Sequence, residues 1–467
     1  MVFSSELFIF CFLPLVCLVF FLLRNRKAQN IWLFITSLVF FSWNQPQYFV
    51  LILAYIFVDW LIALIMEKSK VKHILLVIGI FANLCGLIIF KYLGFISDIV
   101  YDISAIRIPI RELALPIGIS FFTFQGLSYI VDVYRGEVKA QKNLFNFGLY
   151  LALFPQLIAG PIVRYKDVEK QIVTRCYSIN SIVMGVRRFI LGFVYKVLFA
   201  DTFATTVDFI WNEAGLTNNT VAVVWMGSIA YSLQIYFDFY GYSLMAMGIG
   251  KMLGFDFPDN FNNPYISRSI SEFWRRWHIT LSSWFRDYVY IPLGGNRHNV
   301  YRNLLIVFLL TGIWHGAAWQ FIIWGLWHAV FILIERMLKD RNTTHHKSWL
   351  FLSHIYTLLV VNIGWVLFRA DTLRNGILYI QNMFGVNLPA QPGFKIGWYI
   401  NRWNLVILGL SVITILGLPK KIVDKIKNWM DATVFLILSN GAALIAFILC
   451  IVRMVASGYS PFIYFQF

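Results

Sequence analysis

Two histidines, His278 and His315, have surroundings in the sequence that point to chemistry. His315 lies inside an apolar block between Trp314 and Gly316, where burial of a polar group is costly unless the group is paired. His278 lies in a stretch rich in tryptophan and arginine. Histidine is the most frequent general base because its pKa lies near the pH at which enzymes work. The sequence therefore predicts proton transfer at both positions, with a structural role as the alternative at each.

The stretch around His278 has the pattern of an amphipathic helix over residues 271–290. Its apolar stripe is formed by Phe273, Trp277, Leu281 and Trp284. Its polar side is supplied by Arg275, Arg276, Arg286 and Asp287. Rings at headgroup level with arginines toward water are typical of interfacial helices. Burial and the neighbouring arginines would both lower the pKa of His278, so we expect a neutral hydrogen-bond acceptor there.

Other chemistries find little support in the sequence. There is no G-x-S-x-G elbow, phosphate-binding loop or H-E-x-x-H helix. The five cysteines form no C-x-x-C pair, so we predict neither a metal site nor a disulfide framework. Asp238 is a carboxylate among aromatic residues, and it could pair with an arginine or line a polar path.

The composition predicts an integral membrane protein with many spans. Apolar residues make up 59% of the 467 positions and charged residues 13%, where a soluble domain has about a quarter of its residues charged. The net charge of +16 comes mainly from short connections between apolar blocks. A bias of basic residues toward the cytoplasmic side explains that charge without a nucleic-acid partner.

We expect about eleven membrane-embedded helices in a single domain over residues 1–467. The candidate apolar blocks are residues 7–23, 31–42, 49–66, 74–90, 113–131, 145–162, 182–199, 221–253, 304–334, 350–368, 405–418 and 434–455. The basic connections at residues 24–27 and 67–72 place the N-terminus outside the cytoplasm. The first block has no cleavage site and predicts a retained helix rather than a signal peptide.

Two of these blocks predict broken, re-entrant elements. Residues 145–162 have basic connections on both sides and contain Pro155, Gly160 and Pro161, which would break a helix. Residues 304–334 are too few for two straight crossings at about 1.5 Å per residue. We predict a bent hairpin that buries His315 beside a cavity, since non-helical backbone at membrane depth needs protein or water around it.

At these residues the sequence resembles the membrane-bound O-acyltransferase family, in the bacterial branch that O-acetylates alginate and peptidoglycan. The matching stretches are Leu115–Gln125, Phe154–Pro161, Phe237–Tyr242, Phe273–His278, Tyr290–Gly295 and Trp314–Gly316. The opening Phe3–Ser5 and the closing Pro461–Phe467 also look like this branch. The resemblance covers essentially the whole chain, and its motifs are specific when taken together.

The resemblance implies an all-α ring of helices around a thinned centre, with a tunnel joining the two membrane faces. It implies that His315 is catalytic, and His278 matches the second histidine of the branch. It also implies that an acyl thioester, acetyl-CoA or a relative, arrives from the cytoplasm to meet an acceptor hydroxyl outside. We expect the donor-binding residues to be Trp314, Gly316, Arg275, Arg276, Trp277, Arg286, Asp238 and Gln156.

The function that follows is O-acetyl transfer to an envelope polysaccharide in the inner membrane of a bacterium. The resemblance also implies an esterase-like partner outside the cytoplasm that completes the transfer. Two alternatives stay open. A transporter or flippase would also need broken helices and polar residues in the membrane, and a D-alanyl transfer protein for teichoic acid has the same histidine-containing core.

Overall fold

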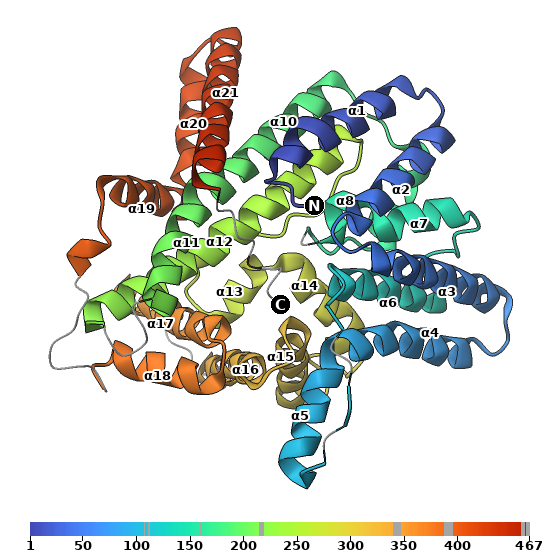
Figure 1. Cartoon of the computed structure of the whole chain (residues 1–467), viewed down its shortest axis with the longest axis horizontal. Coiled ribbons are helices and arrows are strands. Elements are labelled where there is room, and N and C mark those ends of the chain that lie inside the picture. The colour runs from blue at the N-terminus through green and yellow to red at the C-terminus, as the bar shows by residue number, and fades with distance from the viewer. Residues whose placement is uncertain are drawn as a thin grey trace. The chain divides into compact units, whose positions relative to one another are not determined.

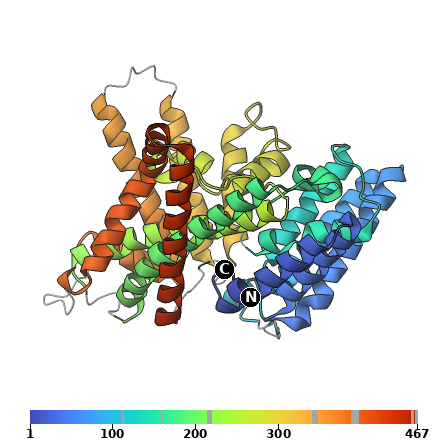
Figure 2. The same ribbon diagram turned by 90° about the horizontal axis from the view of Figure 1, so that it is seen from above.

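The structure, a computed structural model, describes residues 1–106, 108–110, 113–158, 160–213, 219–339, 347–386, 396–458 and 463. Every regular element in these ranges is a helix (Figures 1 and 2), which confirms the all-helical class. The helices form two compact units. We call residues 1–189 with 242–258 the N-terminal unit, and residues 190–241 with 259–467 the C-terminal unit. Most of the closing Pro461–Phe467 motif lies outside the described residues.

The N-terminal unit contains twelve of the described elements, where η marks 3-10 and π turns. They are η1 (Phe8–Phe12), α1 (Leu13–Leu22), α2 (Arg26–Ser42), η2 (Pro46–Tyr48), α3 (Phe49–Lys68), α4 (Lys72–Leu87), η3 (Ile88–Tyr92), α5 (Leu93–Ser104), α6 (Ile119–Arg135), α7 (Leu144–Ala152), α8 (Phe154–Leu157) and α9 (Tyr165–Thr174). Helices α3, α4 and α6 lie side by side (Figures 1 and 2).

Helices α10 (Ile179–Val194) and α12 (Val221–Met252) contribute residues to both units. The C-terminal unit holds the remaining elements. They are η4 (Tyr195–Ala200), α11 (Asp201–Asp208), η5 (Phe209–Glu213), η6 (Pro264–Ile266), α13 (Ile270–Arg276), α14 (Ile279–Phe285), η7 (Arg286–Tyr290), α15 (Val300–His315), α16 (Trp319–Lys339), α17 (Lys347–Arg369), α18 (Leu373–Met383), η8 (Ile396–Trp398), α19 (Arg402–Ile415), α20 (Leu418–Trp429) and α21 (Ala432–Ser457).

Five helical segments of the described residues are long and apolar enough to cross a membrane. They are Pro46–Lys68, Lys72–Ser104, Trp319–Leu338, Trp349–Arg369 and Ala432–Ser457. Shorter apolar helices cover Phe8–Leu22, Val300–His315 and Arg402–Ile415. The chain is therefore a membrane protein. The count of about eleven embedded helices, the ring and the tunnel stay predictions, as does the joining of the two units into one domain.

The predicted break in residues 145–162 is present in the N-terminal unit. Helix α7 ends at Ala152, and Leu153 separates it from the four-residue helix α8, which has Pro155 in its first turn. Proline suits that position because its nitrogen has no hydrogen to offer to a preceding turn. The helix break is confirmed, whereas the re-entrant path through a membrane stays a prediction.

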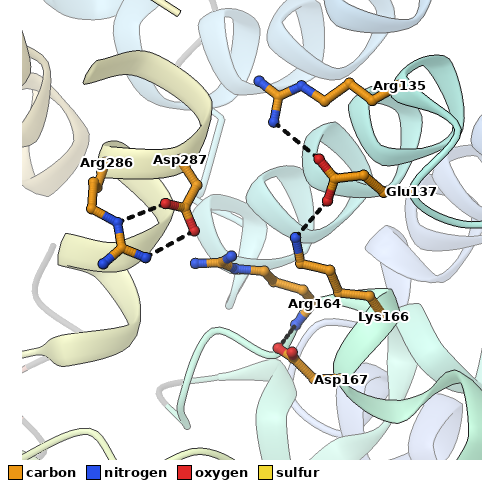
Figure 3. A network of polar contacts seen from close by, with 7 residues as sticks. All are labelled: Arg135, Glu137, Arg164, Lys166, Asp167, Arg286 and Asp287. Atoms are coloured by element: carbon orange, nitrogen blue, oxygen red, sulfur yellow. Dashed lines mark hydrogen bonds and ion pairs between the residues drawn. The ribbon is translucent and has the colours of Figure 1, made fainter. Parts of the chain in front are cut away.

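The two basic connections that flank this block lie on one surface of the N-terminal unit. Lys166 donates to Glu137 across 2.8 Å, and Arg135 lies 3.7 Å from the other oxygen of Glu137 (Figure 3). Lys166 thereby holds the pKa of Glu137 below its ordinary value. The two basic connections are therefore in contact, while the side of the membrane on which they lie stays a prediction.

The prediction of one continuous helix over residues 271–290 is wrong. Helix α13 ends at Arg276, Trp277 is extended, and His278 adopts the left-handed conformation with φ 44° before α14 begins. Two backbone hydrogen bonds to an earlier segment take the place of helical ones: Asn262 N–H donates to Arg276 O at 2.9 Å, and Ile279 N–H donates to Asn260 O at 3.0 Å. The predicted apolar stripe is nevertheless buried throughout.

Glycines allow α10 and α12 to touch backbone to backbone. A Cβ on Gly248 would lie 2.6 Å from the carbonyl oxygen of Gly185, and one on Gly241 would lie 2.7 Å from that of Gly192. Both distances are too short for a real side chain, so glycine is required for the packing. Small residues at helix contacts are the usual means of close association in membranes.

We expect Gly248→Ala to lower stability by about 1–3 kcal/mol, because the added carbon overpacks the contact with α10. The midpoint of thermal unfolding in detergent measures this change. Gly409→Ala is the matched control, since Gly409 lies within α19 and has no atom within 4 Å of the added carbon. The control should be neutral or gain up to about 1 kcal/mol. Equal midpoints for the two variants would contradict the close contact.

Candidate active site

Helices α15 and α16 form a hairpin whose backbones are in contact. A Cβ on Gly312 would lie 2.4 Å from Phe321 O, and one on Gly325 would lie 2.3 Å from Phe308 O. His315 is the last residue of α15. A Cβ on Gly316 would lie 2.1 Å from the Phe321 ring, so this glycine has a packing role. The hairpin predicted from the sequence is confirmed, and it places His315 at its bend.

The imidazole of His315 is enclosed by aromatic rings and is 5% exposed. Its ring centroid lies 4.8 Å from Trp314, 5.0 Å from Trp324 and 5.1 Å from Phe368, all with the rings nearly perpendicular. Edge-to-face contacts of this kind fix the orientation of a ring. The predicted burial of His315 is confirmed.

His278 is fully buried and held by one side chain, Asn260. Its Nδ1 lies 3.0 Å from Asn260 Oδ1. The same oxygen accepts a hydrogen bond from the backbone N–H of Thr280 at 3.3 Å and one from the Thr280 hydroxyl at 2.9 Å. A backbone N–H can only donate, so the atom it faces is the amide oxygen rather than the amide nitrogen.

This assignment fixes the tautomer of His278. Because Asn260 Oδ1 can only accept, His278 Nδ1 carries the proton and donates it. The other nitrogen, Nε2, then carries a lone pair, and it has no hydrogen-bond partner among the described residues. Burial also lowers the pKa of His278 to about 3, so the ring is neutral near pH 7. The expectation of a neutral acceptor agrees with this result, with burial as the cause.

Both histidines lie near the same indole, that of Trp314. The His278 ring centroid is 6.0 Å from Trp314, and Trp314 in turn is 4.8 Å from His315. Phe239 covers another side of His278 at 4.7 Å with its ring perpendicular. The structure thus brings together two histidines that are 37 positions apart in the sequence.

The C-terminal unit also holds a cavity of about 1040 Å³, and neither histidine is among its lining residues. Four arginines contribute to its wall: Arg268, Arg275, Arg286 and Arg336. The apolar part of the wall includes Trp274, Leu281, Phe285, Phe308 and Phe331. Thr311, one helical turn before His315 on α15, also lines it. A cavity with an apolar body and several cations suits a ligand that has an anionic end.

Ring contacts connect Trp274, in the cavity wall, to His315. Its ring lines the cavity, and its centroid is 5.6 Å from Trp324, whose own centroid is 5.0 Å from His315. His328 completes the cluster at 5.2 Å from Trp274. Aromatic rings from α13 and α16 therefore link the cavity wall to His315.

Two of the three predicted arginines line the cavity. Arg275 has its place in the wall, and Arg286 does too, where it also donates to Asp287 at 2.6 and 3.2 Å (Figure 3). Arg276 does not line the cavity, and it donates to Glu272 at 2.9 Å and to Asn262 O at 3.1 Å. Its neighbour Trp277 stacks on Phe273 in the core.

Asp238 lies in a buried ion group of the C-terminal unit rather than in the cavity wall. Lys196 Nζ is 2.9 Å from Asp238 Oδ1 and 2.6 Å from Asp201. The backbone N–H of Ile463 donates to Asp238 Oδ2 at 2.8 Å. Of the two possibilities that the sequence left open, pairing with a cation is the one present, although the cation is a lysine.

Gln156 belongs to the N-terminal unit, where its side-chain nitrogen donates to the carbonyl of Tyr150. In the described part of the chain, no group of three or more His, Cys, Asp or Glu side chains could hold a metal ion.

Sequence reasoning missed Asn260, Thr280 and Glu335. Asn260 sets the tautomer of a histidine 18 positions away, and no spacing rule marks such a contact. Glu335 also lines the cavity. In the sequence it stands at the end of an apolar run and resembles the other charged residues of the basic connection that follows. The one feature of the sequence that could have drawn attention to Glu335 was an acidic residue among arginines.

Comparisons with known proteins bear on the same residues. The family model of the membrane-bound O-acyltransferases matches residues 135–370, a range that includes both histidines and the cavity. The chain is 37% identical to the probable alginate O-acetylase AlgI of Pseudomonas putida over 494 aligned residues, with all of both chains covered.

Two other relatives are named for transfer to other envelope polymers, peptidoglycan and teichoic acid. The peptidoglycan O-acetyltransferase of Helicobacter pylori is 35% identical over 425 residues, which cover 83% of this chain and 80% of that protein. The teichoic acid D-alanyltransferase of Bacillus subtilis is 34% identical over 269 residues, which cover 55% and 67% respectively.

The burial of His278 predicts a pH dependence of stability. Its folded pKa of about 3 lies below the ordinary value of 6.5, so between these pH values the unfolded chain binds the proton and the folded chain does not. Stability therefore falls as pH drops below about 6.5, by roughly 1–2 kcal/mol at pH 5 from this group. Unfolding midpoints between pH 7.5 and 5 measure it.

His278→Asn should remove that part of the pH dependence, since asparagine tolerates the left-handed backbone at this position. His298→Asn is the control, because His298 is exposed, and it should leave the dependence unchanged. If the natural protein and both variants lose stability equally as the pH falls, the lowered pKa of His278 is contradicted.

Proposed function

Because the chain belongs to the membrane-bound O-acyltransferase family, we propose that it moves an acetyl group from a cytoplasmic thioester to a hydroxyl of an extracytoplasmic polysaccharide. The transfer is direct or passes through an esterase-like partner. That the chain is an O-acyltransferase follows from the family and from relatives named alginate O-acetylase and peptidoglycan O-acetyltransferase. The observation that carries the proposal is the pair of buried histidines on Trp314, which aromatic contacts connect to an arginine-lined cavity.

His315 is the general base of the proposed reaction. It takes the proton of the acceptor hydroxyl, whose oxygen bonds to the thioester carbonyl carbon. The C–S bond breaks, and the proton passes to the leaving thiolate. Proton transfer by a positioned base typically contributes about 10²–10⁴-fold to the rate. The aromatic rings around His315 support this role because they hold the imidazole in one orientation.

For His278, two roles were open from the sequence: to orient the donor or to polarise its carbonyl. Polarising the donor carbonyl needs an N–H at Nε2, and the hydrogen bond to Asn260 leaves Nε2 with a lone pair instead. We propose that Nε2 accepts a hydrogen bond from the acceptor hydroxyl or from the donor, and so orients it. A buried neutral histidine can do this without the cost of burying a charge.

The cavity is the proposed donor site. Acetyl-CoA carries several phosphates, and four arginines around an apolar body would hold the phosphates at the mouth while the acyl arm extends toward Trp274. Arginine is well suited to phosphate because its guanidinium forms paired hydrogen bonds. In this proposal the protein lies in the inner membrane of a bacterium, with this mouth on the cytoplasmic side and the N-terminus outside.

Teichoic acid D-alanyl transfer is the second candidate, on the strength of the Bacillus subtilis relative. There the donor rides on a small carrier protein. The partial coverage of this chain by that relative, against the full coverage by AlgI, favours O-acetylation. Co-purification with an acylated carrier, rather than release of acetyl groups from acetyl-CoA, would favour D-alanyl transfer.

We expect His315→Ala to reduce acyl transfer by at least about 10²-fold without lowering the amount of folded protein. Mass spectrometry of O-acetyl groups on envelope glycans, in cells with and without the variant, measures the transfer. His298→Ala is the control and should keep full activity. Undiminished acetylation by the His315 variant would overturn its assignment as the base.

Substitutions of two neighbouring arginines test the proposed donor site. Arg275→Gln should raise the KM for acetyl-CoA by roughly tenfold, because it removes one charge from the cavity wall. Arg276→Gln changes the same charge one residue away, outside the wall, and should leave KM within about twofold. Purified protein in proteoliposomes with labelled acetyl-CoA gives both constants. Equal effects of the two substitutions would place the donor elsewhere.

A further inference from the structure

Glu335, near the end of α16, uses its carboxylate to hold the first turn of α13. One oxygen accepts the backbone N–H of Ile270 at 2.5 Å. The other accepts the backbone N–H of Ser271 at 3.0 Å and the Ser271 hydroxyl at 2.9 Å. Hydrogen bonds to a charged acceptor are the stronger kind, and here three of them come from two consecutive residues.

These donors are ones that α13 cannot satisfy by itself. The first N–H groups of a helix have no partner in the helix, and the Ser269 side chain caps only the N–H of Glu272, at 3.0 Å. A helix of seven residues is also too short to be stable alone. The position of α13 is therefore set by its contacts with other elements, and Glu335 supplies the polar ones at its start.

Glu335 is an acidic residue in a cavity wall that contains four arginines, but its carboxylate binds α13 instead of an arginine. Glu335 lines the cavity together with four arginines, yet it forms none of the ion pairs found among the described residues. Since its oxygens are occupied by α13, it does not neutralise the arginines through direct contact. Arg286 pairs with Asp287, whereas the other three arginines of the wall form no ion pair among the described residues and stay available to an anionic ligand.

Helix α13 joins the parts of the proposed site. It carries Trp274 and Arg275, both in the cavity wall, and its end leads through Trp277 to His278. Helix α16 carries Glu335 and packs on α15, which ends at His315. Glu335 is thus a polar link between the α15–α16 hairpin and the helix that leads to His278.

We propose that Glu335 is a positioning residue: it fixes α13 on the α15–α16 hairpin and so sets the cavity wall relative to His315. This inference rests on the proposed function for its kinetic consequence, but the link itself is a property of the fold. Loss of the carboxylate releases the first turn of α13, which displaces Trp274 and Arg275 while the hairpin keeps its glycine contacts.

The test combines hydrogen exchange with kinetics on the full-length protein in lipid nanodiscs. E335Q keeps the size of the side chain but sets an NH₂ group against N–H donors, and E335A removes the acceptor altogether. D256N is the matched control, since Asp256 is an exposed carboxylate of the N-terminal unit whose ion pair, among the described residues, is with Lys251. S271A removes one of the three hydrogen bonds and should have an intermediate effect.

In E335Q and E335A, amide exchange of residues 270–276 should rise at least about tenfold, with residues 300–315 unchanged. The KM for acetyl-CoA should rise about tenfold while kcat falls less than threefold, because His315 stays in place. D256N should match the natural protein in both measurements.

Unchanged exchange in E335A would overturn the link between Glu335 and α13. Faster exchange with an unchanged KM would overturn the positioning role. If the natural protein does not use acetyl-CoA at all, the proposed donor fails, and the exchange measurement still decides whether Glu335 holds α13.

Discussion

The contact between the backbones of α15 and α16 is the constraint on which the site depends. At Gly312 and Gly325 the two helices approach so closely that any side chain would overlap a carbonyl group. This contact places His315 at the bend of the hairpin and Trp324 against His315. It also sets the position of Glu335, which lies two turns after His328 on α16. A site built on two helices in direct contact is stiffer than one built on loops, as accurate proton transfer needs.

The second histidine is placed by the opposite means, an interruption of helix. The left-handed residue His278 separates α13 from α14, and the hydrogen bonds to residues 260 and 262 replace those of a continuous helix. Backbone strain of this kind persists only where the surroundings enforce it. Here the same asparagine that pairs with the backbone also selects the tautomer, so one residue determines both the path of the chain and the chemistry of the ring.

These two cases show what the sequence could and could not predict. The hairpin around His315 was predictable because length, glycines and basic flanks are local features. The burial of Phe273, Trp277, Leu281 and Trp284 was also predicted correctly, since a stripe of large apolar residues has to be covered. The break at His278 was not, because its cause is Asn260, far along the chain. Arg275 and Arg276 look alike in the sequence. Only the folded backbone shows that Arg275 lies in the cavity wall whereas Arg276 pairs with Glu272.

The buried ion group around Lys196 has a consequence for how the chain is made. The ribosome makes the charged residues of this group, Lys196, Asp201 and Asp238, before most of the C-terminal unit. The backbone N–H that donates to Asp238 belongs to Ile463, 225 positions later. Charges in a membrane interior are costly until every partner is present. The hydrogen bond from Ile463 can therefore form only after nearly all of the chain has been synthesised. Until then Asp238 lacks this donor, so the buried group reaches its final arrangement late in biosynthesis.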